Sequence, residues 1–208
     1  MEERNRVEEP DLGLYADSAV ANDSAHRKQK KRNRLVKEIL IDSISILLAL
    51  FVACMIVKFV GQRTVVDGSS MEPTLSNNDN LIVDKISYRI HDPERFDVIV
   101  FQYQYEKNTF YVKRVIGLPG ETVRIDEEGN IYINEVLLVE NYGREQMLDP
   151  GLAYNGFTLG EDEYFVLGDN RNHSSDSRTI SVAGVNRDTI VGKVWVRIYP
   201  FNKIGSVQ

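Results

Sequence analysis

Two hydrophobic patterns divide this chain of 208 residues. Residues 39–60 are mostly apolar, and their only charged side chains, Asp42 and Lys58, lie near the two ends. A helix of that length extends over about 33 Å and can cross a hydrocarbon core of about 30 Å, although a buried amphipathic helix is the alternative. From Thr64 onward, short β-branched and aromatic runs alternate with turn residues. We therefore predict a membrane anchor over 35–61 and a β domain over 62–208.

The second pattern predicts a mostly β fold, an antiparallel sheet or partial barrel with long loops, preceded by one N-terminal transmembrane helix. No sustained 3.6-residue period follows the anchor. Turn residues lie at 77–79, 119–120, 128–130 and 168–170. The expected strands lie at 65–66, 81–83, 98–101, 110–116, 122–125, 131–133, 164–167 and 189–199.

The residues before the anchor predict its orientation. Residues 1–25 are polar and mostly acidic, as in a disordered tail, whereas 26–37 hold seven lysines and arginines. A basic run beside an apolar segment favours the cytoplasmic side, so 1–34 is expected to be a cytoplasmic tail and the β domain extracytoplasmic. Residues 57–60 (VKFV) lack the small side chains of a leader cleavage site, so we expect the anchor to be retained.

Composition and charge exclude several function classes. The net charge is −6, and residues 61–208 carry 22 acidic against 15 basic side chains, which argues against a nucleic-acid partner. The only cysteine, Cys54, cannot form an intrachain disulfide. Three isolated histidines, His26, His91 and His173, offer no zinc-type spacing, and no Gly-rich phosphate loop is present. We therefore expect neither a metal nor a cofactor.

The candidate nucleophile is Ser70, in the stretch 66–75 (VDGSSMEPTL) that follows the apolar run. Clusters of Gly, Ser and Pro are usually surface loops, and that interpretation stands beside a catalytic one. A histidine that activates Ser70 would be His91 or His173, because His26 lies across the membrane in the predicted topology. A polar loop histidine such as His173 is more often simply solvated.

Lys113 is the other candidate base, in the predicted strand 110–116 (FYVKRVI). An exposed strand lysine is the simpler interpretation. To act as a base near neutral pH, its pKa has to fall from about 10.4 to about 7–8 through burial or nearby cations. Side chains alternate along a strand, so Arg114 is expected on the opposite face and burial is the expected cause.

A polar loop follows the strand at 164–167, with the sequence GDNRNHSSDSR at 168–178. Its Asx and Ser side chains favour an internally hydrogen-bonded loop. The charged side chains that can pair within it are Asp169, Arg171, Asp176 and Arg178. Such a loop either caps the domain or holds one wall of a site and offers a hydroxyl to a lysine amine.

Together these segments resemble the type I signal peptidases, serine–lysine membrane proteases that remove signal peptides from exported proteins. Four motifs match in the family's order, at 68–75, 79–85, 111–120 and 168–178. With the anchor, the resemblance covers roughly residues 35–200. The single anchor and the short stretch 121–163 resemble the smaller Gram-positive enzymes.

The resemblance implies a role for each matching residue. Ser70 attacks the scissile carbonyl, neutral Lys113 takes its proton, and Ser174 orients the lysine amine. The residues expected to brace the surrounding loop are Asp169, Asp176 and Arg178. The Ser70 N–H donates to the oxyanion, while Gly68 stands where some members carry a second, hydroxyl donor. One such donor is worth about 10²–10³ in rate, so a backbone group or a water has to replace it.

The resemblance also implies the partners, which are the lipid bilayer and the signal peptides of exported precursors. Family members bind the precursor as an extended strand, with pockets for small side chains at −1 and −3. Met71, Ile82 and Val83 are expected to line that groove. Two other functions stay open: a catalytically silent relative that only binds signal peptides, and a self-cleaving repressor-type peptidase, which needs a DNA-binding module.

Overall fold

The computed structural model describes residues 30–31, 33–34, 36–53, 55 and 61–207, in two compact units, 1–54 and 55–208. In the first unit, residues 36–53 form a helix. Within the described residues, no helix combines the length and the apolar character needed to cross a membrane. Residues 1–29 and 32 of the predicted tail (1–34) and residues 35, 54 and 56–60 of the predicted anchor (35–61) lie outside the described residues.

The second unit contains two antiparallel sheets in its described part. The larger comprises β1 (Gly61–Val65), β2 (Asn80–Asp84), β3 (Val98–Gln102), β4 (Phe110–Gly117), β9 (Glu163–Leu167), β10 (Val185–Asn186), β11 (Ile190–Tyr199) and β12 (Gly205–Ser206). The smaller comprises β5 (Thr122–Ile125), β6 (Ile131–Ile133), β7 (Val136–Leu137) and β8 (Phe157–Thr158). Short 3-10 helices lie between them: η1 (Ser87–Arg89), η2 (Gly151–Ala153), η3 (Arg171–His173), η4 (Arg187–Thr189) and η5 (Phe201–Lys203).

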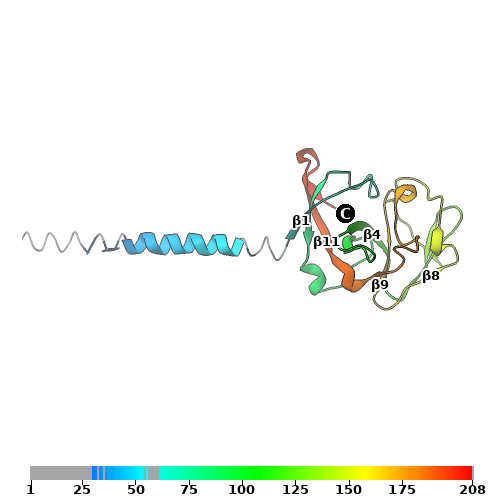
Figure 1. Cartoon of the computed structure of the whole chain (residues 1–208), viewed down its shortest axis with the longest axis horizontal. Helices are drawn as coiled ribbons and strands as arrows, with labels where there is room; N and C mark the ends of the chain where they lie inside the picture. The colour runs from blue at the N-terminus through cyan, green and yellow to red at the C-terminus, as the bar shows by residue number, and fades with distance from the viewer. Residues whose placement is uncertain (1–29, 32, 35, 54, 56–60, 208) are drawn as a thin grey trace, which may run out of the picture. The chain divides into compact units, whose positions relative to one another are not determined.

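The strand order of the larger sheet is β1-β2-β11-β3-β4-β9-β10, with β12 paired to β11, and that of the smaller sheet is β7-β6-β5-β8. Figure 1 shows β1, β11, β4 and β9 in one part of the domain and β8 in the other. The long strand β11 therefore lies between β2 and β3, pairing Val194 with Val83 and Lys193 with Ile99. The C-terminal part of the chain thus joins two segments that precede it by about a hundred residues.

Alternating apolar side chains place the core on both sides of β4. Leu81 and Val83 of β2 are buried in a cluster with Met71 and Leu75 from the predicted nucleophile stretch. A second cluster packs Ile116 of β4 against the smaller sheet, whose apolar residues carry the same period-two pattern. The predicted mostly β, antiparallel fold is confirmed. The two-residue strands β7, β8, β10 and β12 were not predicted, because so short a run has no detectable period.

Candidate active site

The turn that carries Ser70 is fixed by its own backbone hydrogen bonds. The Glu72 N–H donates to the Ser69 carbonyl at 3.1 Å, and the Leu75 N–H donates to Met71 at 2.8 Å. Gly68 has a φ of +103°, and a Cβ there would meet no atom within 4 Å, so backbone conformation and not space requires glycine. The Gly68 N–H donates to Asn77 Oδ1 at 3.0 Å, which occupies that donor.

β4 places Lys113 against this turn. Its Nζ lies 2.8 Å from Ser70 Oγ and 3.0 Å from the Val112 carbonyl oxygen. The side chain is 4% exposed, which excludes the exposed-lysine interpretation. Burial lowers the pKa of Lys113 to about 8, although the charges of Asp176 and Asp169 act in the opposite direction. A pKa in this range leaves part of the population with a neutral amine near neutral pH.

Arg114, the next residue on β4, forms a buried ion pair with Asp169. Its Nη2 lies 2.7 Å from Asp169 Oδ2, and its guanidinium carbon lies 3.7 Å from the centre of the Tyr142 ring. Asp169 also accepts a hydrogen bond from Thr74 Oγ1 at 2.5 Å. One carboxylate therefore joins three segments: the nucleophile turn, β4 and the polar loop at 168–178.

The loop at 168–178 is held by charge pairs and by close packing. Arg178 Nε lies 2.8 Å from Asp176 Oδ1, and Asp176 Oδ2 accepts from the Gly168 N–H at 3.1 Å. A Cβ on Gly168 would lie 2.5 Å from the Ser70 carbonyl oxygen and would overlap the Ser174 hydroxyl. Ser174 Oγ is buried beside this contact, and it has no hydrogen-bond partner in the described structure, Lys113 included.

Asn170 is a contact residue that the sequence did not single out. Its backbone N–H donates to the Ser70 carbonyl oxygen at 3.0 Å, and its Nδ2 donates to the Ser69 carbonyl oxygen at 3.0 Å. The sequence signal was only its place in a loop rich in Asx residues, which does not distinguish it from Asn172 two positions later.

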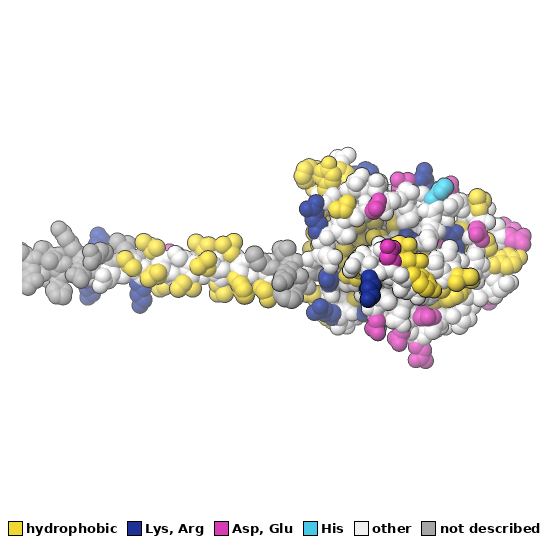
Figure 2. Space-filling model, viewed as in Figure 1, with side chains coloured by type: hydrophobic (Ala, Val, Ile, Leu, Met, Phe, Trp, Pro, Cys, Tyr) yellow, Lys and Arg dark blue, Asp and Glu magenta, His cyan; other side chains and the backbone are white. Residues whose placement is uncertain are grey.

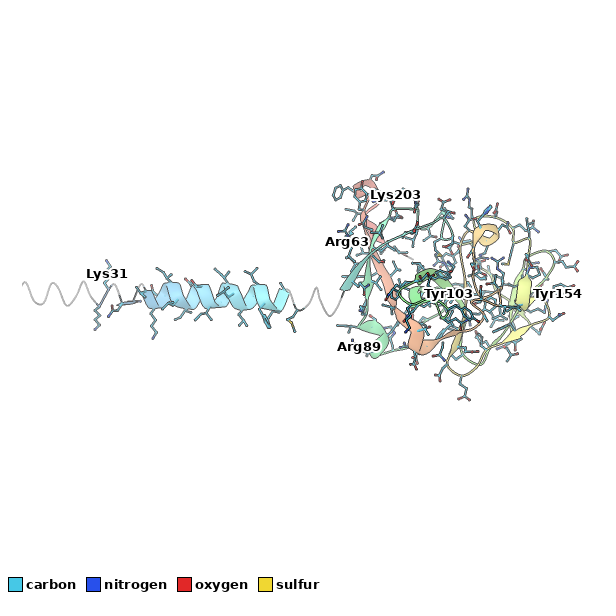
Figure 3. The ribbon with its side chains drawn as sticks, in the orientation of Figure 1. Lys31, Arg63, Arg89, Tyr103, Tyr154 and Lys203 are labelled. Atoms are coloured by element: carbon cyan, nitrogen blue, oxygen red, sulfur yellow. The ribbon has the colours of Figure 1, made fainter. Side chains whose placement is uncertain are left out.

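Ser70 and Lys113 open onto a cavity of about 340 Å³. It is lined by Thr64, Val65, Val66, Asp67, Gly68, Ser69, Ser70, Met71, Val100, Phe110, Tyr111, Val112, Lys113, His173 and Ser175. Tyr111 also stacks on Tyr103, with 4.8 Å between ring centres, and Tyr103 is labelled in Figure 3. The apolar walls therefore come from residues on both sides of Ser70, from Val100 of β3 and from the first half of β4.

Of the three residues predicted to line the substrate groove, one lines the cavity and two do not. Met71 lines the cavity, whereas Ile82 and Val83 are absent from its lining. Side chains alternate along β2, so Val83 lies with Leu81 on the face that packs into the core, and Ile82 lies on the opposite face. The exposed His173 lies at the cavity, but the amine beside Ser70 Oγ belongs to Lys113.

A hydroxyl in hydrogen-bond contact with a buried amine, at the wall of a cavity, is the arrangement that a serine–lysine hydrolase needs. The comparisons with known proteins agree with this class. The family model described as signal peptidase, peptidase S26, matches residues 36–199. The chain belongs to this family.

Individual relatives carry related names. A probable signal peptidase I-2 of Synechocystis sp. is 41% identical over 162 residues, which cover 76% of this chain and 72% of that protein. A signal peptidase I of Leptolyngbya laminosa is 37% identical, over 88% of this chain and 89% of the relative. The crystal structure of a signal peptidase I from Enterococcus faecalis V583 is 35% identical, with a TM-score of 0.41, and covers 50% of this chain and 98% of that one.

Proposed function

We propose that this chain is a membrane-bound serine endopeptidase that removes N-terminal signal peptides from exported precursor proteins, with Ser70 as the nucleophile and Lys113 as the general base. The observation that carries the proposal is the 2.8 Å separation of Ser70 Oγ and Lys113 Nζ, with the amine buried. Burial favours the neutral amine, and only the neutral amine can accept a proton.

The reaction proceeds through an acyl-enzyme. Ser70 Oγ attacks the scissile carbonyl while Lys113 Nζ takes the hydroxyl proton, and Lys113 then gives that proton to the leaving amine as the peptide C–N bond breaks. A water molecule attacks the resulting ester, again with Lys113 as base, and releases the carboxylate of the signal peptide. Ser70 and neutral Lys113 are regenerated.

The Ser70 N–H is the proposed first donor to the oxyanion. It has no hydrogen-bond partner in the described part of the chain, so it is available to the negative oxygen of the tetrahedral intermediate. The Gly68 N–H, already bonded to Asn77, is not available as the second donor without a rearrangement. Ser174 is proposed to turn its buried hydroxyl to the lysine amine, and Asp169, Asp176 and Arg178 to hold the loop around both.

The precursor is proposed to bind in the cavity as an extended strand between the residues before Ser70 and the first half of β4. Val66, Met71 and Tyr111 supply apolar wall at this place. Small side chains at −1 and −3 of the precursor fit a cavity whose walls carry such large side chains. The mode is strand addition, in which backbone hydrogen bonds hold the peptide and side-chain pockets select it.

The lipid bilayer is the second proposed partner. The apolar run over 39–60, with the basic cluster before it, supports an anchor over 35–61, a cytoplasmic tail over 1–34 and an extracytoplasmic domain over 62–208. The projecting turn after β11 also suits an interfacial position: Figure 2 shows hydrophobic side chains gathered there, where Figure 3 labels Lys203. Phe201 is 78% exposed at this turn, and aromatic and lysine side chains are favoured at headgroup level.

The test is cleavage of a precursor peptide with Ala at −1 and −3 by the detergent-solubilised full chain. Ser70→Ala and Lys113→Ala should each abolish cleavage while the protein accumulates normally. Ser76→Ala and Lys85→Ala are the matched controls, because both side chains lie outside the cavity, and both should retain activity. Cleavage that persists in Ser70→Ala contradicts the assignment of the nucleophile.

The same assay separates the two other functions. A silent relative binds the precursor peptide without cutting it. A self-cleaving repressor-type peptidase loses its own intact band on storage, in a Ser70-dependent way, and leaves the added peptide uncut.

A further inference from the structure

Asn170 contacts the nucleophile turn through two donors at once. Its backbone N–H reaches the Ser70 carbonyl oxygen and its side-chain Nδ2 reaches the Ser69 carbonyl oxygen, each at 3.0 Å. The residue is 1% exposed, and it lies more than a hundred positions along the chain from Ser69. Two consecutive peptide carbonyls of the turn are therefore held by one residue of the 168–178 loop.

The geometry of the peptide bond gives these contacts a consequence. In a trans peptide, the carbonyl oxygen and the following N–H point in opposite directions from a rigid plane. The peptide between Ser69 and Ser70 has its oxygen held by Asn170 Nδ2 and by the Glu72 N–H. Its N–H, which belongs to Ser70, must point away from both and stays unpaired beside the cavity that Ser70 lines.

The unused atom of the Asn170 amide supports the same reasoning. Asn170 Oδ1 is buried and has no hydrogen-bond partner in the part of the chain that the structure describes. An unpaired buried acceptor costs free energy, so a side chain kept only to fill this space would be better apolar. An apolar side chain of this size has no N–H group to donate to the Ser69 carbonyl oxygen, which Asn170 Nδ2 does.

We propose that Asn170 is a positioning residue for the oxyanion site, holding the Ser69 carbonyl oxygen so that the Ser70 N–H stays directed at the cavity. The inference rests on the proposed function, since it assigns a task within that reaction. Asn170 touches neither substrate nor the reacting atoms. Its effect falls on the transition state, where the oxygen becomes negative, and leaves the bound ground state almost unchanged.

Two variants test the donor itself. Asn170→Asp keeps the shape of the side chain but has no donor for Ser69 at neutral pH, and Asn170→Ala removes the amide without introducing a buried charge. Both retain the backbone N–H bond to Ser70. Asn172→Ala is the matched control, because the Asn172 amide bonds Gln146 and Leu148 outside the site. Thermal unfolding of each variant shows whether it is folded. If the Asn170→Asp variant does not fold, the test rests on Asn170→Ala.

Three measurements separate positioning from a general structural role. We expect kcat on the precursor peptide to fall by about 10–100-fold with KM within about twofold. A peptide aldehyde, whose adduct with Ser70 places an oxygen at the oxyanion site, should lose affinity by the same factor. In the Ser70→Ala background, the Kd of the uncleaved precursor peptide should change by no more than about twofold on Asn170→Ala.

The outcomes are distinguishable. If the aldehyde affinity is unchanged, or falls only as much as the affinity for the uncleaved peptide, the positioning role is wrong even though Ser70-dependent cleavage continues in the wild type and in Asn172→Ala. If the wild type itself does not cleave the precursor, the proposed function fails, independently of Asn170.

Discussion

Arg114 and Asp169 form a bidentate ion pair in which both side chains are fully buried, with Nε to Oδ1 at 2.9 Å and Nη2 to Oδ2 at 2.7 Å. The pair links β4, which carries Lys113, to the loop that packs on the Ser70 turn. Removing one partner leaves the other charge buried, which costs much more than the intact pair contributes. The site therefore depends on a contact that touches neither Ser70 nor Lys113.

Asp169→Asn should lower the free energy of unfolding by about 3–5 kcal/mol, because the Arg114 charge loses its buried counter-ion. Urea denaturation of the solubilised protein measures the change. Glu135→Gln is the control, since it breaks the exposed Arg124–Glu135 pair and should have a much smaller effect on stability. If the two substitutions reduced stability equally, the claim that burial makes the loss of Asp169 more costly would be wrong.

The pH dependence of cleavage should follow Lys113. In the proposed mechanism the neutral amine is the active form, and its pKa is lowered to about 8, so kcat/KM should rise as pH increases and level off above pH 8. The pH–rate profile of the wild type measures this midpoint. A midpoint near 6.5 that disappears in His173→Ala would instead identify a histidine base.

Lys113→Met should inactivate the protein and stabilise it at pH 7. Folding lowers the pKa of Lys113 from 10.5 to about 8. Below pH 8 the buried amine is protonated, so the free energy of unfolding is reduced by the full cost of burying that charge. That cost, up to about 3 kcal/mol, shrinks between pH 8 and 10.5 and is absent above. Unfolding of wild type and variant compared across pH 7–11 should show the gain from Met disappearing over this window.

Gly168→Ala should strongly reduce cleavage, because the added Cβ collides with the Ser70 carbonyl oxygen and the Ser174 hydroxyl. The loop has to move off the nucleophile turn to admit it. Gly205→Ala is the control, since a Cβ there meets nothing within 4 Å and its activity should be unchanged. Initial rates at saturating peptide compare the two, and wild-type activity of Gly168→Ala would show that the close packing is dispensable.

His173→Ala should keep activity within a few-fold of the wild type. The side chain is exposed at the cavity, and Ser70 Oγ already has its amine neighbour in Lys113. Initial cleavage rates measure the effect. A loss as large as that of Ser70→Ala would assign His173 a direct part in the reaction.

Local pattern was enough to predict much of this fold. The strands from β2 to β6, together with β9 and β11, coincide with β-branched runs between turn residues, and such runs are visible without any knowledge of what they pair with. Ser70 and Lys113 were predicted as site residues because each lies within an ordered series of motifs, and the structure brings the two side chains into contact. The burial of Lys113 could not be predicted from its flanking sequence, because the same residues suit an exposed strand equally well.

What the sequence did not reveal depends on pairing between distant segments. Ile82 and Val83 follow the nucleophile stretch closely, yet the pairing of β2 within the sheet places Val83 on the face that packs into the core. Asn170 and Asn172 look alike in the sequence, and only the fold brings one of them to the Ser69 carbonyl. Contacts across a hundred residues leave no local periodicity from which they can be predicted.

The place of β11 between β2 and β3 makes the larger sheet depend on a strand that is synthesised late. During synthesis, the segments that carry Ser70 and Lys113 emerge long before Ile190–Tyr199, the strand that joins their two halves of the sheet. Until that strand inserts, β2 and β3 lack their common neighbour, and we expect the contact between Ser70 and Lys113 to be absent. In the proposed reaction, we therefore expect cleavage to begin only after nearly the whole domain has been made.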